Sequence, residues 1–114
     1  MGQKVFNEQC HQAFLSADQG DNIIIIPAIV LMEILYLFEK SRIKIDLIQT
    51  EVLLKSKNYQ YEPLSLEILK TAADIDDIPE LHDRMIAATA RHLDIPLITN
   101  DPVIRKSRFI KILE

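Results

Sequence analysis

The stretch LHDRMIAATARHLDIPLITND, residues 81–101, decides the fold of this chain. From Asp83 onward, small and apolar residues recur at helical spacing, which predicts a helix that packs closely against a sheet. After a turn at Ile95-Pro96, the segment Leu97–Thr99 has the composition of a short buried strand. Asp101 comes just after that strand. The stretch therefore predicts a helix, a turn and a strand, with one acid where the helix opens and another where the strand closes.

A second informative stretch lies upstream. Four consecutive isoleucines, Ile23–Ile26, describe a strand buried on both faces, as in parallel sheets that are covered by helices. Pro27 suits the first turn of a helix, and residues 28–40 are apolar almost all round. Glu33 is the only charged residue between Ile23 and Phe38, and a carboxylate there needs a cation, a partner or an opening to solvent. A role for Glu33 in a site is therefore favoured over chance exposure.

The other segments alternate between helix and strand. The patterns predict helices over residues 3–18, 45–57 and 66–75, the last capped by Ser65, a strand or extended segment over 58–64, a short helix from Pro102 and an edge strand over 109–112. This alternation predicts a three-layer α/β/α sandwich with a mostly parallel sheet. We expect residues 1–114 to form a single domain of ordinary size.

Composition limits the class of protein. The single cysteine, Cys10, excludes an intramolecular disulfide and a cysteine zinc cluster, so a cytoplasmic, reducing location is expected. The apolar residues 23–38 are too few to span a membrane, are interrupted by Pro27 and carry Glu33, so no membrane partner is expected. The formal net charge of -4 gives no support for nucleic-acid binding by overall charge.

Local charges are more informative than the total. Two basic stretches, Lys40, Arg42 and Lys44 and then Arg105, Lys106, Arg108 and Lys111, are candidate contacts for a phosphate backbone or simply solvated faces. Three acids, Asp74, Asp76 and Asp77, crowd the end of the helix over 66–75. Acids are unfavourable there because of the helix dipole, so they indicate a solvated loop or a local positive partner, and the solvated loop is favoured.

Three carboxylates stand out by their positions: Glu33 after one buried strand, Asp83 at the start of a helix and Asp101 at the end of another strand. Right-handed crossovers place all three at the same edge of a parallel sheet. Converging Asp and Glu oxygens without cysteine select the hard cations Mg²⁺ or Mn²⁺ over zinc. Such a site suits the hydrolysis of phosphodiesters.

At these residues the sequence resembles the PIN domain family, and in particular the VapC-like toxin ribonucleases of bacterial toxin–antitoxin pairs. The resemblance lies in IIIIPAIVLMEILYLFEK with Glu33, in ELHDRMIAATARHLDIPLITND with Asp83 and Asp101, and in the terminal FIKIL. It implies a metal-dependent endoribonuclease in which Glu33, Asp83 and Asp101 are both metal ligands and catalytic acids, with Thr99 and Asn100 beside them. It also implies an RNA substrate and a cognate antitoxin protein as partners.

The chain departs from the family pattern at its beginning. PIN domains typically open with a hydrophobic strand that ends in an aspartate, whereas residues 1–6 here are MGQKVF. We therefore expect an N-terminally truncated domain that lacks its first, central strand and one metal-ligand acid. The gap would leave neighbouring strands with unpaired backbone groups, which favours a homodimer or higher oligomer, with strand exchange as one route.

Two other functions stay open. A catalytically incomplete PIN-like domain would act as a binding or interaction module and would not cleave RNA. A phosphotransfer or small-molecule site on a doubly wound fold is the weaker alternative, because Gly2 and Gly20 are the only glycines and no glycine-rich phosphate loop can be formed.

Overall fold

The computed structural model describes residues 22–56 and 58–113. Its elements are β1 (Ile24–Pro27), α2 (Ala28–Glu39), α3 (Leu47–Leu54), β2 (Tyr59–Glu62), α4 (Leu66–Asp74), α5 (Leu81–Leu93) and α6 (Pro102–Arg105). The expected helix over residues 3–18 and Cys10 lie outside the described residues. Helices alternate with parallel-paired segments, so the predicted α/β fold class is confirmed, with a smaller sheet than expected.

The sheet consists of two parallel strands. β1 pairs with β2 in the register Ile24↔Tyr59 to Pro27↔Glu62, and the α2–α3 connection provides the crossover that a parallel pair needs. The expected strands over 97–99 and 109–112 are wrong as continuous strands. They are reduced to one parallel bridge, Leu97↔Ile112, with Leu97 N–H donating to Lys111 O at 2.8 Å. A strand extends only where neighbours pair with it, and among the described residues Leu97 pairs on one edge only.

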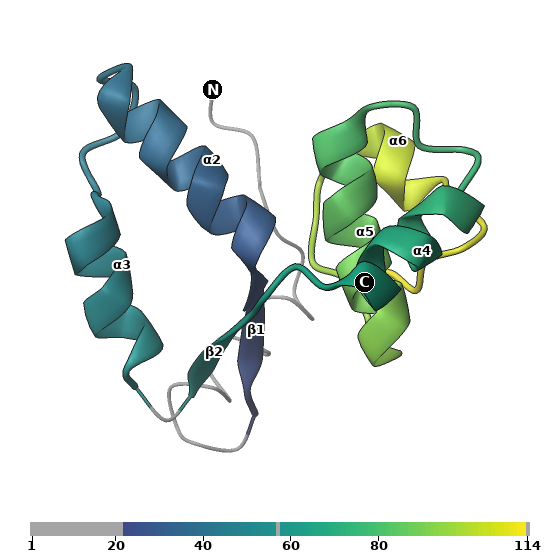
Figure 1. Ribbon diagram of the computed structural model, residues 1–114, viewed down its shortest axis with the longest axis horizontal. Coiled ribbons are helices and arrows are strands. Elements are labelled where there is room, and N and C mark those ends of the chain that lie inside the picture. Colours follow the sequence, from purple (N-terminus) through teal and green to yellow (C-terminus); the bar gives the residue numbers. More distant parts are fainter. Residues whose placement is uncertain (1–21, 57, 114) are drawn as a thin grey trace.

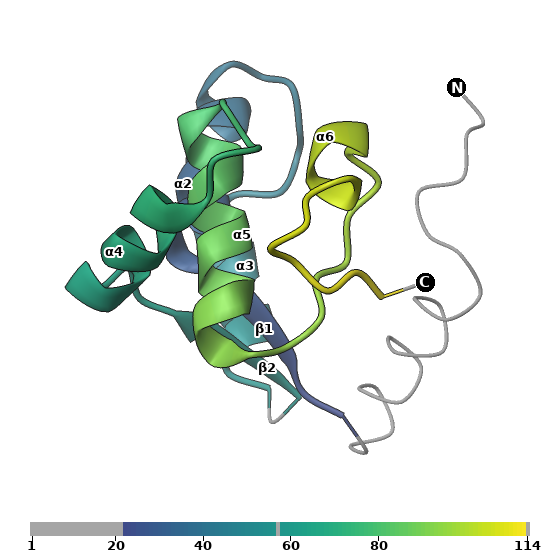
Figure 2. The ribbon, with the colours of Figure 1, turned by 90° about the vertical axis from the view of Figure 1, so that its right-hand side faces the viewer.

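The elements form two groups that lie next to each other (Figure 1). One group contains β1, β2, α2 and α3, and the other contains α4, α5 and α6. Figure 2, turned by a right angle, shows α5 between α4 and the α6 segment. Glu33 belongs to the first group, and Asp83 belongs to the second.

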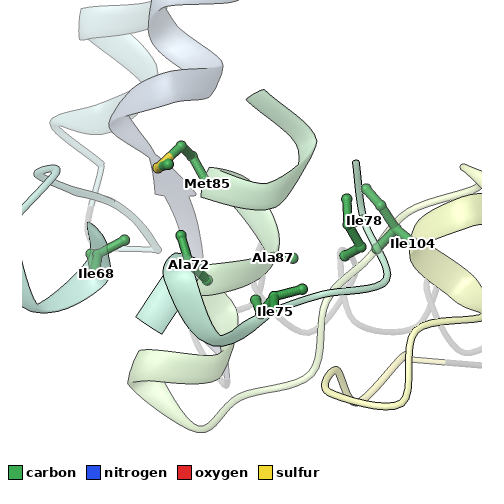
Figure 3. Packing of buried hydrophobic residues seen from close by; sticks show 8 residues of the cluster. Ile68, Ala72, Ile75, Ile78, Met85, Ala87 and Ile104 are labelled. Atoms are coloured by element: carbon green, nitrogen blue, oxygen red, sulfur yellow. The ribbon is translucent and has the colours of Figure 1, made fainter. Parts of the chain in front are cut away.

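The core is the contact between α4 and α5. Ile68 and Ala72 of α4 meet Ala87 and Ala88 of α5, and all four are almost inaccessible to solvent. The two alanines of α5 allow the helix axes to approach closely, as the small residues of this helix predict. Figure 3 shows the same cluster extending through Ile75 and Ile78 of the following loop to Ile104 of α6. This core fixes where α5 begins and ends.

Both ends of the central helices are capped by local sequence signals. The Ser65 hydroxyl accepts from Ile68 N–H at 3.2 Å, which confirms the predicted cap of α4. α5 begins at Leu81, two residues before the predicted start at Asp83, because Glu80 provides its N-cap. At its other end Asp94 adopts a left-handed conformation with φ of 57°, which stops the helix.

Two of the acids that follow the helix over 66–75, Asp76 and Asp77, have the positive partner that was the less favoured alternative, although Asp76 also remains exposed to solvent. Asp77 accepts hydrogen bonds from the Ser107 hydroxyl at 2.7 Å and from Arg108 N–H at 2.9 Å. Asp76 forms an ion pair with the Arg108 guanidinium at 2.9 Å. The positive partner comes from more than 30 residues away in the sequence, so no local pattern could have indicated it.

No helix in the described part of the chain is long and apolar enough to cross a membrane.

Replacing Asp77 by Asn should destabilise the fold by about 1 kcal/mol at neutral pH, since it removes the charge that Ser107 and Arg108 bind. Burial raises the pKa of Asp77, but the hydrogen bonds from Arg108 and Ser107 outweigh it and hold the pKa below its ordinary value. The stabilisation is therefore present above the ordinary aspartate pKa and is lost as pH falls through the lowered one. Urea unfolding of both proteins across this range measures the difference.

Asp74→Asn is the matched control, because Asp74 is an exposed acid at the last position of α4. An equal loss of stability in both variants, or a loss from Asp77→Asn that persists in acid, would contradict this assignment.

Candidate metal centre

Glu33 lies in the second turn of α2 and is partly buried. The helix starts directly after β1, with Pro27 in extended conformation at its N-cap, so Glu33 is placed close to the carboxyl end of that strand. Burial raises the pKa of Glu33, the charge of His82 opposes this, and the charges of Asp83 and Glu80 add to it. Glu33, in the group that contains α2, is therefore close enough to the start of α5 for the charges of His82, Asp83 and Glu80 to affect it.

Asp83 lies in the first turn of α5, where a negative charge is favourable to the helix dipole. Glu80 Oε1 accepts from the Asp83 backbone N–H at 2.8 Å, which fixes this turn. Burial raises the pKa of the Asp83 carboxyl, and the neighbouring charges of Asp101 and Glu80 raise it further. The carboxyl group thus lies among like charges, the situation that a cation relieves.

Asp101 is the N-cap of α6. Its Oδ1 accepts from Val103 N–H at 2.8 Å and from Ile104 N–H at 3.2 Å, and its own N–H donates to Thr99 Oγ1 at 3.1 Å. The Arg105 guanidinium returns from α6 to donate to Thr99 O at 3.1 Å. Thr99 therefore lies beside Asp101 and orders it, while Asn100 between them is exposed. Oδ1 of Asp101 accepts the hydrogen bonds at the start of α6, which leaves Oδ2 for a metal ion.

Sequence reasoning missed Glu80 and His82. His82 Nδ1 donates to Glu80 Oε2 at 2.9 Å, and this bond raises the pKa of His82. The pKa of Glu80 is lowered by the Asp83 N–H first and by His82 second. The acid three residues before Asp83 was the available signal, because a side-chain acceptor at that spacing is typical of an N-cap. The pair places a hydrogen-bonded imidazole next to the acids.

Glu33 lies within electrostatic reach of Asp83, and Asp83 lies within reach of Asp101, so Asp83 links the other two predicted acids. Their oxygens are the donors that Mg²⁺ and Mn²⁺ prefer, so the chemistry of the set fits a hard cation. Within residues 22–56 and 58–113, no three Asp, Glu, His or Cys side chains are close enough to coordinate one ion together. Among the described residues, Asp83 is therefore linked electrostatically to Glu33 and to Asp101, but the three acids do not share one coordination point.

The basic candidates fall into two classes by their contacts. Lys40, Arg42 and Lys44 are exposed in the connection from α2 to α3, where the Lys40 ammonium lies 5.6 Å from the centre of the Tyr36 ring. Arg105 and Lys106 lie on or just after α6, close in sequence to Asp101. Arg108 is used elsewhere, in its ion pair with Asp76 and over the Phe109 ring at 4.5 Å.

Replacing Asp83 by Asn should raise the melting temperature of the metal-free protein by a few degrees at neutral pH. The raised pKa of Asp83 means that its contribution to stability is lost as pH rises through that value, and an amide does not suffer this loss. The gain should vanish below the ordinary aspartate pKa. Thermal unfolding in a chelating buffer measures the melting temperature of both proteins. Glu51→Gln, at an exposed position of α3, is the control. A lower melting temperature for Asp83→Asn at neutral pH would contradict the claim that neighbouring acids destabilise the charged Asp83.

Comparison with known proteins places these observations in a family. No curated protein matched the chain. A family model for the PIN domain matches residues 4–110, a range that includes every described element and the residues Glu33, Asp83 and Asp101. The match covers nearly the whole chain, so this protein belongs to the PIN domain family.

Proposed function

We propose that this chain is a Mg²⁺- or Mn²⁺-dependent endoribonuclease of the toxin type. Membership of the PIN family indicates a nuclease-type function, and PIN domains in general depend on divalent metal ions. The finer proposal is supported by the electrostatic reach of Asp83 to Glu33 and to Asp101, and by the pKa values of Glu33 and Asp83, which burial and neighbouring acids raise. A site of this kind is costly to the fold unless it holds a cation.

Each acid has a distinct task in this proposal. Asp83 is held by the first turn of α5 and the Glu80 cap, so its carboxyl is the fixed point of the site. Asp101 is oriented by its bonds to the start of α6 and by Thr99. Glu33 comes from the other group of elements and completes the donor set. A bound divalent ion supplies charge neutralisation for the phosphodiester and lowers the pKa of water.

In this proposal, basic side chains of the α2–α3 connection and of the α6 segment hold the RNA backbone. Lys40, Arg42 and Lys44 extend from the α2–α3 connection, and Arg105 and Lys106 extend from α6. Positive groups flanking an acidic centre would draw the phosphates towards the ion. Arg108 is the weakest candidate, since Asp76 and Phe109 already bind its guanidinium.

The protein partners follow from the same proposal. A toxin-type nuclease implies a cognate antitoxin that blocks it. Large apolar side chains exposed on α2 and α3, among them Met32, Tyr36, Ile48 and Val52, support contact with another protein surface, including a second copy of this chain.

A binding module is the second candidate, favoured by one observation. A mostly apolar groove of about 980 Å³ lies between the two groups of elements. A domain that used this groove to bind another molecule would need no metal, and Mn²⁺ would leave its stability unchanged.

Mn²⁺ should raise the melting temperature of the intact chain at neutral pH, and Asp83→Asn should abolish that rise. The same substitution should lower the rate of cleavage of a single-stranded RNA by more than about 100-fold, since even outer-shell changes at metal sites reduce activity by about 10–100-fold. Asp74→Asn is the control and should keep both properties. An unmodified chain whose melting temperature ignores Mn²⁺ and Mg²⁺ would favour the binding module.

Lys106→Ala should weaken binding of RNA by an inactive Asp83→Asn protein and reduce the slope of log affinity against log salt by about one, as expected for one lost phosphate contact. Lys70→Ala, at an exposed position of α4, is the matched control and should leave the slope unchanged. Fluorescence anisotropy at several salt concentrations measures both. An unchanged slope in Lys106→Ala would remove this residue from the RNA surface.

A further inference from the structure

An apolar groove of about 980 Å³ lies between β1 and the segment over residues 95–98. Residues 23–27 and residues 95–98 all line it, without a gap in either run. Successive side chains of an extended chain point to opposite faces, so a space that touches every one of them runs along the edge of that chain. The groove therefore lies between two backbone edges.

On the β1 side, the edge that faces the groove is unpaired within the described part of the chain. Ile24 N–H donates to Asn58 O at 2.9 Å, and Ile24 pairs with Tyr59 of β2. The backbone groups of neighbouring residues in a strand point to opposite edges, so the N–H and C=O of Ile25 point away from β2. Ile25 lines the groove, and it therefore presents one donor and one acceptor to that space.

The other edge has the same arrangement. Leu97 N–H donates to Lys111 O at 2.8 Å, and Leu97 O accepts from Leu113 N–H at 3.0 Å. Both backbone groups of Leu97 thus point to the terminal segment, so those of Ile98 point the other way, to the groove that Ile98 lines. In the described part of the chain, the Ile98 N–H donates to no other backbone group.

The side chains around the groove decide what kind of molecule fits between these edges. Among the described residues that line it none is charged, and α2 and α5 contribute apolar side chains such as Val30, Ile34 and Ile86. A charged occupant would lose its hydration there without gaining a counter-charge. An apolar small molecule or a helix would leave the backbone groups of Ile25 and Ile98 unpaired. An extended polypeptide with uncharged side chains satisfies both requirements.

The described part of the chain has no free extended segment that could fill the groove. β1 and β2 pair with each other, and Leu97 pairs with Ile112. The sequence over residues 3–18 predicts a helix, whose backbone groups bond to one another. A second copy of the chain would have to give up one of its own pairings to offer a strand. A strand of a different polypeptide costs this chain no pairing.

We propose that the groove binds an extended segment of a different polypeptide, which adds as a strand between its two edges. The segment is about five residues long, the length of the run 23–27, and its side chains are apolar and mostly β-branched. Its backbone bonds to Ile25 on one side and to Ile98 on the other, so it joins the β1–β2 pair and the Leu97–Ile112 bridge into one sheet. Proline is excluded from its interior, because the N–H groups on both edges are needed.

Exchange of backbone amide hydrogens tests this pairing directly. The probe is a capped peptide in which valine and isoleucine alternate, with a lysine at each end for solubility, titrated into the full, isotopically labelled chain in a chelating buffer. Saturating peptide should slow exchange of the Ile25 and Ile98 amides at least tenfold. The Ile24 amide is the internal control and should change little, because it already donates to Asn58 O.

Three results would overturn the proposal. The first is that the peptide does not bind, and the second is that it binds without slowing exchange at Ile25 and Ile98. The third is that both amides exchange slowly before any peptide is added, which would mean that this chain or a second copy already fills the groove.

A second measurement separates strand pairing from the burial of apolar surface. The same peptide with N-methyl groups on alternate backbone nitrogens keeps its side chains but loses the donors of one edge, so it should bind about tenfold more weakly. In the protein, Ile25→Pro removes the N–H that faces the groove and should weaken binding of the unmethylated peptide by a similar factor, whereas Ile25→Val keeps that N–H and should bind normally. Equal affinity for the two peptides would overturn pairing, and this comparison decides alone if Ile25→Pro does not fold.

Neither measurement involves a metal ion, so strand binding and the proposed nuclease fail separately. A melting temperature that ignores Mn²⁺ would refute the nuclease and leave strand binding standing. A peptide that does not bind would refute strand binding and leave the nuclease standing.

Discussion

The position at which α5 begins decides where Asp83 lies relative to Glu33 and Asp101. Ala87 and Ala88 allow α5 to pack tightly on Ile68 and Ala72 of α4, so the helix cannot shift along its axis without opening the core. Glu80 then sets the start of the helix, because its side chain accepts a hydrogen bond from the Asp83 N–H at 2.8 Å. Packing therefore fixes the helix, the cap fixes its first turn, and the two together fix Asp83 among the charges of Asp101, Glu80 and Glu33.

That arrangement is electrostatically unfavourable by itself. Burial and like charges raise the pKa of both Glu33 and Asp83, and among the described residues His82 is the neighbour whose charge opposes this for both. Elsewhere in the chain the acids are satisfied in ordinary ways: Asp77 by Ser107 and Arg108, and Asp94 by Lys111 at 2.7 Å. Asp77 and Asp94 thus have partners that stabilise their charge, whereas Glu33 and Asp83 have raised pKa values because their charge is unfavourable. Acids of the second kind are typical of functional sites.

Much of this could be predicted from the sequence, because the responsible signals are local. The isoleucine run predicted β1, and Ser65 predicted the cap of α4. The choice of Glu33, Asp83 and Asp101 as site residues, made from their places after strands and at a helix start, stays a prediction. What was missed depends on distant or tertiary partners. The Asp77–Arg108 contact joins residues more than 30 positions apart, and Leu97–Thr99 forms a single bridge because strand length is decided by neighbours in space. The groove between β1 and Leu97 is likewise a property of the assembled elements.

The central claim is that Glu33, Asp83 and Asp101 are ligands of one divalent metal centre. Anomalous diffraction from crystals of the full chain soaked in Mn²⁺ tests it most directly, since manganese can be located without reference to the protein phases. The account predicts anomalous density between the starts of α5 and α6 and the second turn of α2, with carboxylate oxygens of all three acids directed at it. Density confined to other carboxylates, or none at this edge under saturating Mn²⁺, would contradict it.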